Sequence, residues 1–194
     1  GETTAKNGHW EKGLGIEFFW RMKECLGEKE IIAEDLGYVT DSVRQLVRDS
    51  GFPGMKVLEF AFDSRDSGSA NDYLPHNYIQ NSIVYTGSHD NETLTGWFGS
   101  IRPEERKMVR NYLNNYRDSD KEIYWDMVCL AMGSVSKLCV IPIQDYLGYD
   151  NSARINKPST IGTNWKWRLK KGEITEELLK RIRDLTMWYG RYYG

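Results

Sequence analysis

Two stretches of this sequence, IIAEDLG at residues 31–37 and IVYTGSHDN at residues 83–91, determine the fold that we expect. In each stretch, an apolar run that favours β-structure leads into carboxylates, with Gly or Asn close behind. A buried parallel strand has this appearance when it delivers acidic groups to a site at its carboxyl end. We therefore expect a parallel sheet with an acidic site where its strands end.

Strand-like and helix-like segments alternate along the chain. The predicted strands cover residues 31–33, 55–62, 83–86 and 138–143. The predicted helices cover residues 16–26, 40–51, 103–116, 123–132 and 178–189. This alternation predicts an α/β fold with parallel strands joined by right-handed crossovers. About four strands are half of a (β/α)8 barrel, which usually has ~250 residues, and an open sheet is the alternative.

Composition excludes several classes of partner. The chain has 194 residues, of which 40% are hydrophobic and 28% charged, and its formal net charge is −2. These values are typical of a globular domain, and we expect a single domain over residues 1–194. Because there is no basic excess, we expect no nucleic acid and no membrane surface as a partner. No apolar run approaches the ~20 residues of a membrane span.

Cysteine and histidine give no sign of a metal or redox site. The cysteines, Cys25, Cys129 and Cys139, have no C-x-x-C spacing, so we expect reduced thiols in a cytoplasmic protein. No two histidines have the i, i+4 spacing of a zinc-binding helix. We expect no metal and no other cofactor.

Every predicted strand ends in an acid. The candidates are Glu34 and Asp35, Asp63, Asp90 beside His89, and Asp145 beside Gln144. Because the carboxyl ends of parallel strands meet, we expect these groups to converge. Local roles are the alternative for three of them: a cap for Asp35, an Asx turn for Asp63, and a pair with Arg154 for Asp145. Glu34 is harder to explain locally, because a Glu after Ile-Ile-Ala and beside a second acid is costly to bury without a purpose.

Clustered carboxylates suit glycosyl transfer. That chemistry needs one protonated carboxyl group to donate to the leaving oxygen, and ionised ones to face the developing oxocarbenium charge. Neighbouring acids raise one another's pKa and so supply the protonated member. Metal binding is a rival use, but the acids lie far apart in sequence and have no Ca²⁺-loop spacing. Aromatic residues make up 13% of the chain, and their faces can stack on sugars.

Five ordered motifs carry a resemblance to a known family. They are IIAEDLG at 31–37, GFPGMKVLEFAFD at 51–63, YLPHNY at 73–78, VYTGSHDNETLTGWF at 84–98 and ARINKPSTIGTNWKWRL at 153–169. Together they resemble the 4-α-glucanotransferases, the amylomaltase or disproportionating-enzyme family. The resemblance implies a retaining enzyme on a (β/α)8 barrel. Such an enzyme cleaves an α-1,4 bond of a maltooligosaccharide, holds the donor covalently and passes it to another sugar hydroxyl.

The resemblance also implies roles for individual residues. Glu34 matches the general acid/base, and Asp90 matches the third carboxylate, which stabilises the distorted sugar and the transition state. The substrate-binding residues that it implies are His89, Asn91, Asn156 near the donor sugar, and Phe60, a strand-end aromatic beside the acceptor sites.

One catalytic residue of the family has no counterpart here. The nucleophile is an Asp in an Arg-x-Asp-His motif before the acid/base, and residues 1–33 contain no Asp. We therefore expect the C-terminal portion of the enzyme, carrying the second half of the barrel, without transfer activity when alone. Exposed half-barrel edges predict self-association.

Two other classes of function are considered. A non-catalytic α-glucan-binding module could use Trp97, Phe98, Trp165 and Trp167 as stacking platforms, although helix or loop packing explains at least half of them. A hydrolase on an open sheet would need a Ser or Cys nucleophile elbow, and the chain has no G-x-S-x-G motif.

Overall fold

The computed structural model describes residues 2–9, 11–37, 39–65, 68–117 and 119–192. The chain divides into two compact units, Gly1–Gly54 and Met55–Gly194. A single functional domain over residues 1–194 stays a prediction.

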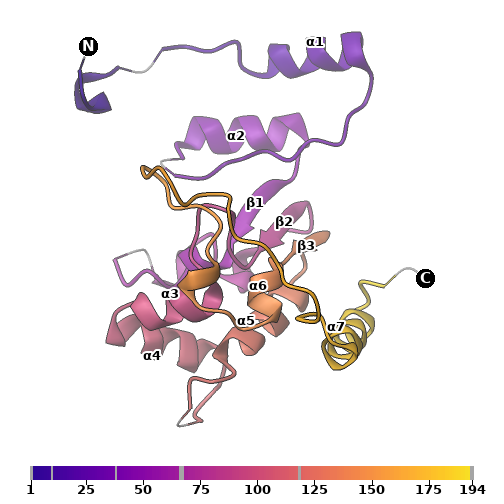
Figure 1. Ribbon diagram of the computed structural model, residues 1–194. Helices are drawn as coiled ribbons and strands as arrows, with labels where there is room; N and C mark the ends of the chain where they lie inside the picture. Colours follow the sequence, from indigo (N-terminus) through magenta and orange to yellow (C-terminus); the bar gives the residue numbers. More distant parts are fainter. Residues whose placement is uncertain (1, 10, 38, 66–67, 118, 193–194) are drawn as a thin grey trace. The chain divides into compact units, whose positions relative to one another are not determined.

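Two helices account for most of the regular structure described in the first unit. They are α1 (Ile16–Leu26) and α2 (Asp41–Ser50), preceded by a 3-10 turn, η1 (Ala5–Asn7) (Figure 1). Both agree with the prediction because local signals mark their ends. The Thr40 hydroxyl caps α2, and Gly51 ends it in the left-handed conformation at φ 72°.

The predicted strand at residues 31–33 is wrong in its length. Ala33 pairs in a parallel bridge with Gly54, and its N–H donates to the Pro53 carbonyl at 2.9 Å. Pro53 lacks the N–H that would extend the ladder toward residue 31, so the ladder stops beside it. Within the described part of the first unit, one paired residue replaces the expected strand.

A small parallel sheet lies at the centre of the second unit (Figure 1). Among the described residues its strands are β1 (Gly54–Val57), β2 (Ser82–Tyr85) and β3 (Leu138–Val140), in the order β1-β2-β3. β2 and β3 are parallel, with Ile83 opposite Leu138. The α/β class and the parallel direction are confirmed, and the described residues form three strands and the bridge at Ala33 where four strands were predicted.

Two predicted strands end earlier than expected. β1 stops at Val57, and residues 58–62 form a 3-10 helix, η2 (Leu58–Phe62). A short apolar run such as LEFAF does not distinguish a strand from a helix by its periodicity. β3 stops before Pro142, which cannot donate a ladder hydrogen bond and instead precedes a short helix, α6 (Ile143–Tyr146).

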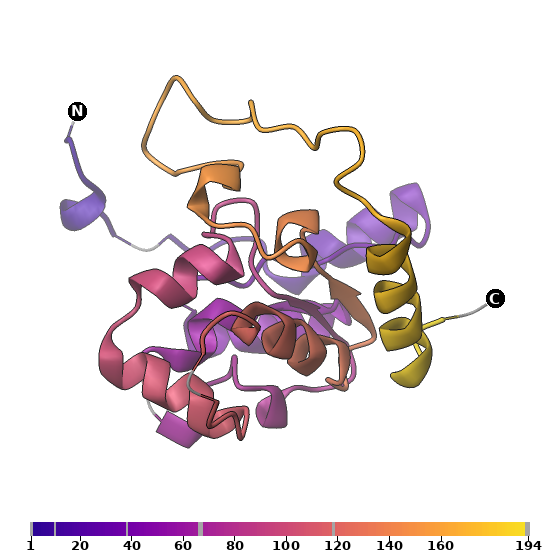
Figure 2. The ribbon, with the colours of Figure 1, turned by 60° about the horizontal axis from the view of Figure 1, so that its bottom comes forward.

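Helices pack around the sheet and enclose the core (Figures 1 and 2). The other helices of the second unit are α3 (Leu94–Ser100), α4 (Pro103–Tyr112), α5 (Ile123–Met132) and α7 (Glu176–Trp188), with 3-10 turns η3 (Gly68–Ala70), η4 (Pro75–Asn77) and η5 (Asn151–Ala153). α4, α5 and α7 were predicted, whereas α3 and α6 were not. From η5 to α7 the chain runs as a long loop, the orange trace in Figure 2.

The core of the second unit forms where α3, α4 and α5 meet the sheet. α5 contacts α3, α6 and α7. The most deeply buried apolar side chains are Val57, Leu58, Val84, Leu94, Val109, Met127, Val128 and Ala131. Burial of these side chains is the main contribution to folding of this unit.

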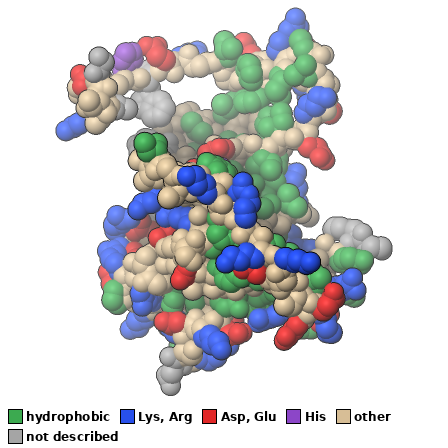
Figure 3. All heavy atoms as spheres, in the orientation of Figure 1, with side chains coloured by type: hydrophobic (Ala, Val, Ile, Leu, Met, Phe, Trp, Pro, Cys, Tyr) green, Lys and Arg blue, Asp and Glu red, His purple; other side chains and the backbone are tan. Residues whose placement is uncertain are grey.

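The surface of the second unit has no single sign of charge. Acidic and basic side chains intermingle on the face shown in Figure 3. In the described part of the chain, no helix has the length and apolar character needed to cross a bilayer. The same residues contain no group of three or more His, Cys, Asp or Glu side chains placed to hold a metal ion.

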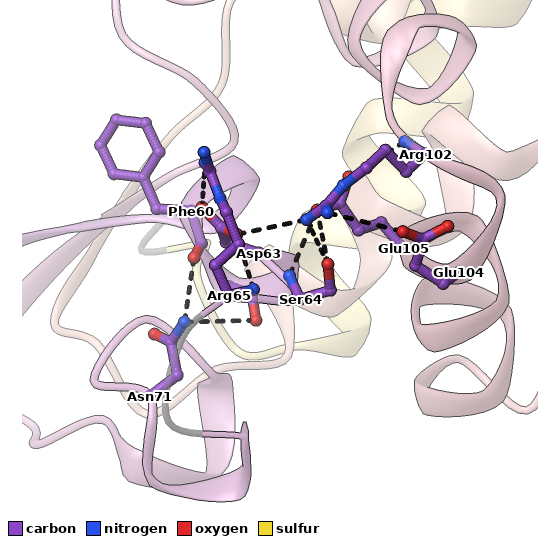
Figure 4. Close-up of polar contacts among 9 residues, drawn as sticks. Phe60, Asp63, Ser64, Arg65, Asn71, Arg102, Glu104 and Glu105 are labelled. Atoms are coloured by element: carbon purple, nitrogen blue, oxygen red, sulfur yellow. Dashed lines mark hydrogen bonds and ion pairs between the residues drawn. The ribbon is translucent and has the colours of Figure 1, made fainter.

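A carboxylate at the start of α4 ties that helix to the loop after η2 (Figure 4). Glu105 accepts hydrogen bonds from the Arg102 N–H at 3.0 Å and from the Ser64 N–H at 3.2 Å, and it pairs with the Arg102 guanidinium at 2.5 Å. The Arg102 guanidinium lowers the pKa of Glu105 to about 2. Asp63 accepts from the N–H and side chain of Arg65, so the Asx turn considered for it is present.

The Glu105 carboxylate predicts how stability changes in acid. Because its folded-state pKa lies below its ordinary value, its contribution is present above pH ~4.5 and is lost as the pH falls toward ~2. Glu105→Gln should lower the free energy of unfolding by about 1–2 kcal/mol at pH 7, and this deficit should shrink below pH ~4. Urea denaturation followed by tryptophan fluorescence measures both values. A deficit that is constant from pH 7 to pH 2.5 would contradict the assignment.

Candidate active site

The turn that follows β2 carries three of the predicted site residues. Asn91 closes it: its side-chain oxygen accepts from the Ser88 N–H at 3.0 Å and the Ser88 hydroxyl at 2.7 Å. The Asn91 N–H donates to the Ser88 carbonyl at 3.2 Å. His89 and Asp90 therefore lie at the exposed tip of a closed turn.

Asp90 is held by residues from the loop after η5. The Asn156 side-chain amide donates to Asp90 Oδ1 at 2.5 Å. The Arg154 guanidinium donates to the Asp90 carbonyl at 2.6 Å and to the Asn156 carbonyl at 2.9 Å. His89 Nε2 lies 3.4 Å from Asp90 Oδ1. The structure thus brings together Asp90, His89 and Asn156, which were predicted to share a site.

An exposed tryptophan adjoins this group. The ring centroids of Trp165 and His89 lie 5.2 Å apart, with the rings tilted by 42°. Trp165 is 56% exposed and has a left-handed backbone at φ 64°. Its N–H donates to the Ile155 carbonyl at 2.8 Å, which closes the intervening loop at its base. A solvent-facing indole in this place can stack on a sugar ring.

Two of the other proposed stacking aromatics belong to the core. Trp97 and Phe98 are buried on α3, where Trp97 packs against Phe62. They have no free face for a sugar, so the packing explanation holds for both. This removes two of the four platforms on which a pure glucan-binding module would depend.

Phe60 lies on η2, not at the end of a strand as predicted. Its ring packs edge to face against Tyr73, with centroids 5.4 Å apart. Figure 4 shows the ring pointing away from the polar cluster around Asp63 and Arg102. Phe60 is 38% exposed and so presents apolar surface to the solvent.

Glu34 belongs to the first unit, one residue after the bridge at Ala33. Its side chain is exposed, so the argument from the cost of burying it is wrong. The neighbouring Asp35 is partly buried, and its carboxylate lies against Gly54, where an added Cβ would be 2.5 Å from Oδ2. Of the two adjacent acids, Glu34 is the one that faces solvent.

Asp145 is buried and has a role within the fold. Its two oxygens accept from the Thr86 hydroxyl at 2.6 Å and the Leu94 N–H at 2.8 Å. Burial raises its pKa to about 6. The pair with Arg154 that was considered for Asp145 is replaced by these two bonds, which join α6 to the end of β2 and the start of α3.

Comparison with known proteins identifies the family. A family model described as 4-alpha-glucanotransferase matches residues 1–175. The chain belongs to the 4-alpha-glucanotransferase family.

Relatives and solved structures agree with this assignment. The chain is 44% identical to a 4-alpha-glucanotransferase of Clostridium butyricum over 192 residues, which are 98% of this chain and 38% of that protein. It is 41% identical to the Thermus thermophilus 4-alpha-glucanotransferase over 187 residues, 94% of this chain and 37% of the relative. An amylomaltase from Streptococcus agalactiae, solved in complex with acarbose, matches 99% of this chain and 38% of its own, with a TM-score of 0.90 and 36% identity. The chain therefore spans less than two-fifths of the length of these relatives.

Two acids of this 4-alpha-glucanotransferase chain were missed in the sequence. Glu92 accepts from the Asn151 amide at 2.8 Å and lies 3.8 Å from the Arg154 guanidinium. Glu59 is buried on η2 beneath the turn. The signal for Glu59 was available, because it is a single acid within the apolar run LEFAF, the same kind of pattern that drew attention to Glu34.

The buried bonds of Asp145 predict a stability effect. Asp145→Ala leaves the Thr86 hydroxyl and the Leu94 N–H without their acceptor in the core, so the free energy of unfolding should fall by about 2–4 kcal/mol. Asp145→Asn keeps one acceptor and should cost about half as much. Urea denaturation of both variants measures the difference. An Asp145→Ala variant as stable as the parent would show that these two hydrogen bonds make no net contribution to the free energy of unfolding.

Proposed function

We propose that this chain supplies the acid/base and the charge-stabilising carboxylate of a retaining 4-α-glucanotransferase, which transfers α-1,4-glucan segments between maltooligosaccharides. The observation that carries the proposal is the set of contacts that orient Asp90. Asn156 donates to its carboxylate, Arg154 donates to its carbonyl, and His89 lies beside its carboxylate. Family membership over residues 1–175 supports the same activity.

Each residue has a role that fits its surroundings. Glu34, exposed after Ala33, acts as the general acid and then the general base. Asp90 presents its carboxylate to the positive charge that develops on the sugar in the transition state. His89, Asn91, Asn156 and Phe60 bind sugar. The acarbose bound to the related amylomaltase supports an α-glucan-like ligand for this chain.

We infer that the sheet is the second half of a (β/α)8 barrel. The strands are short and parallel, and β2 leads directly into the turn that carries Asp90, as expected at the carboxyl end of a barrel strand. Leu138 and Val140 of β3 are exposed, and further strands of a barrel would cover them. The same exposed edge is the surface through which we expect the chain to self-associate when alone.

A cytoplasmic location stays a prediction. A relative from Solanum tuberosum, 40% identical over 193 residues, is named as chloroplastic/amyloplastic.

A chimera tests the activity. This chain replaces the matching segment of the Clostridium butyricum relative, and the chimera should convert maltotriose to glucose and longer maltooligosaccharides.

Glu34→Gln should lower the transfer rate by ~10²–10⁴-fold and leave maltotriose binding in place, because it removes proton transfer. Asp90→Asn should lower it by ~10²–10³-fold, because it removes a transition-state charge. Asp184→Asn, an acid pairing with Lys180 on α7, is the matched control. A folded chimera without transfer, or full activity in Glu34→Gln, would overturn the proposal.

The chain alone should be inactive. A retaining mechanism needs a nucleophile about 5 Å from the acid/base, and residues 1–33 hold no Asp. Incubation of the isolated chain with maltotriose, followed by chromatography, should show no glucose above the Glu34→Gln background. Products formed at the rate of the chimera would mean that another carboxylate of this chain serves as nucleophile.

A further inference from the structure

Glu59 is a buried acid that the proposed mechanism does not use. It is the second residue of η2, and only 6% of it is exposed. Within the described residues, its Oε1 has no hydrogen-bond partner. Burying a carboxyl group is costly unless it is neutral or paired, so its surroundings need an explanation.

The Glu59 carboxyl group lies against the start of the turn after β2. Its N–H donates to the Thr86 carbonyl at 3.3 Å, which ties η2 to the end of β2. A Cβ added to Gly87 would lie 2.9 Å from Glu59 Oε1 and 3.1 Å from Asn91 Cβ. Glu59 and Asn91 therefore enclose Gly87, and a larger residue there would displace one of them.

Asn91 connects Glu59 to the exposed part of the turn. Its side chain adjoins the Glu59 carboxyl group at Gly87, and its side-chain oxygen accepts both bonds from Ser88. The only residues between Ser88 and Asn91 are His89 and Asp90. A movement of Asn91 would therefore move both ends of the segment that carries them.

The surroundings of Glu59 disfavour the ionised form of its carboxyl group. Burial, and then the nearby Asp145 carboxylate, raise its pKa well above the ordinary value; Glu92 acts in the same direction, and Arg154 and Asn91 act against it. A neutral carboxyl group keeps one O–H donor and one acceptor oxygen, much like an amide in shape and polarity. Gln should therefore replace it with little change.

We propose that Glu59 is a positioning residue, which holds the Ser88–Asn91 turn through Asn91 and so fixes His89 and Asp90. The effect of Glu59 on catalysis rests on the proposed function. Its effect on the conformation of the Ser88–Asn91 turn does not.

Hydrogen exchange on the chain tests directly whether Glu59 stabilises the Ser88–Asn91 turn. Glu59→Ala should speed exchange of the Asn91 and Ser88 amides, relative to the Val84 amide in β2, by about tenfold or more, because the turn opens locally. Glu59→Gln should stay within about threefold of the parent. Glu105→Ala removes a Glu that is equally buried at α4 and should leave this ratio unchanged. Equal ratios in Glu59→Ala and Glu105→Ala would overturn the proposal.

Kinetics of the chimera test the consequence. A turn displaced by about 1 Å should lower kcat by ~10–100-fold in Glu59→Ala, with a smaller change in KM, and Glu59→Gln should recover most of the rate. Because Glu59 acts through Asn91, the double variant with Asn91→Ala should be no slower than Asn91→Ala alone. Additive losses, or no recovery in Glu59→Gln, would refute the link. An inactive parent chimera would refute the proposed function, and the exchange ratios would still decide whether Glu59 holds the turn.

Discussion

The two hydrogen bonds that the buried Asp145 accepts are the constraint on which the second unit depends. One comes from Thr86 at the end of β2, and the other from the Leu94 N–H at the start of α3. The seven residues between these donors form the turn that carries His89 and Asp90. A single carboxylate on α6 therefore fixes both ends of that turn. Since both donors are buried, the alternative to these bonds is two unsatisfied polar groups in the core.

The carboxylates of the second unit divide by their surroundings. Asp145 and Glu59 are buried, and burial raises the pKa of both. Asp90 is exposed at the tip of the turn. The buried carboxyl groups thus belong to the scaffold, and the exposed Asp90 is the one that we propose as a reactive group.

Elements with strong local signals could be predicted from the sequence, and those that depend on tertiary partners could not. Thr40, Gly51 and Pro103 mark helix ends through their own chemistry, and α2 and α4 begin or end where they indicate. The end of β1 was misjudged because LEFAF packs into the core as a 3-10 helix, which its apolar character alone does not reveal. The strand at 31–33 was overestimated because Pro53, next to the bridge partner Gly54, lacks the N–H that would extend the pairing.

In the candidate site, too, features with a local sequence signal could be predicted and features that depend on tertiary partners could not. The rule that acids follow strand ends pointed to Asp90, and the structure places Asp90 in the turn after β2, which is a genuine strand. Its catalytic role stays a prediction. The same rule misjudged Asp145, whose strand ends before Pro142 and whose side chain faces the core. Glu34 was chosen on a burial argument that its exposed side chain does not support, and its catalytic role depends on the family motif alone. The bond between Asn156 and Asp90 joins residues 66 positions apart, which no local pattern reveals.

Arg154 shows how this site keeps the charge of Asp90 available. A guanidinium this close could form a salt bridge with the Asp90 carboxylate, which would neutralise it. Instead its donors bind the carbonyls of Asp90 and Asn156, and it forms its ion pair with Glu92, at 3.8 Å. The Asp90 carboxylate takes its short bond from the neutral amide of Asn156. Its orientation is therefore fixed by a neutral donor, which suits the role that we propose for it, of facing a developing cation.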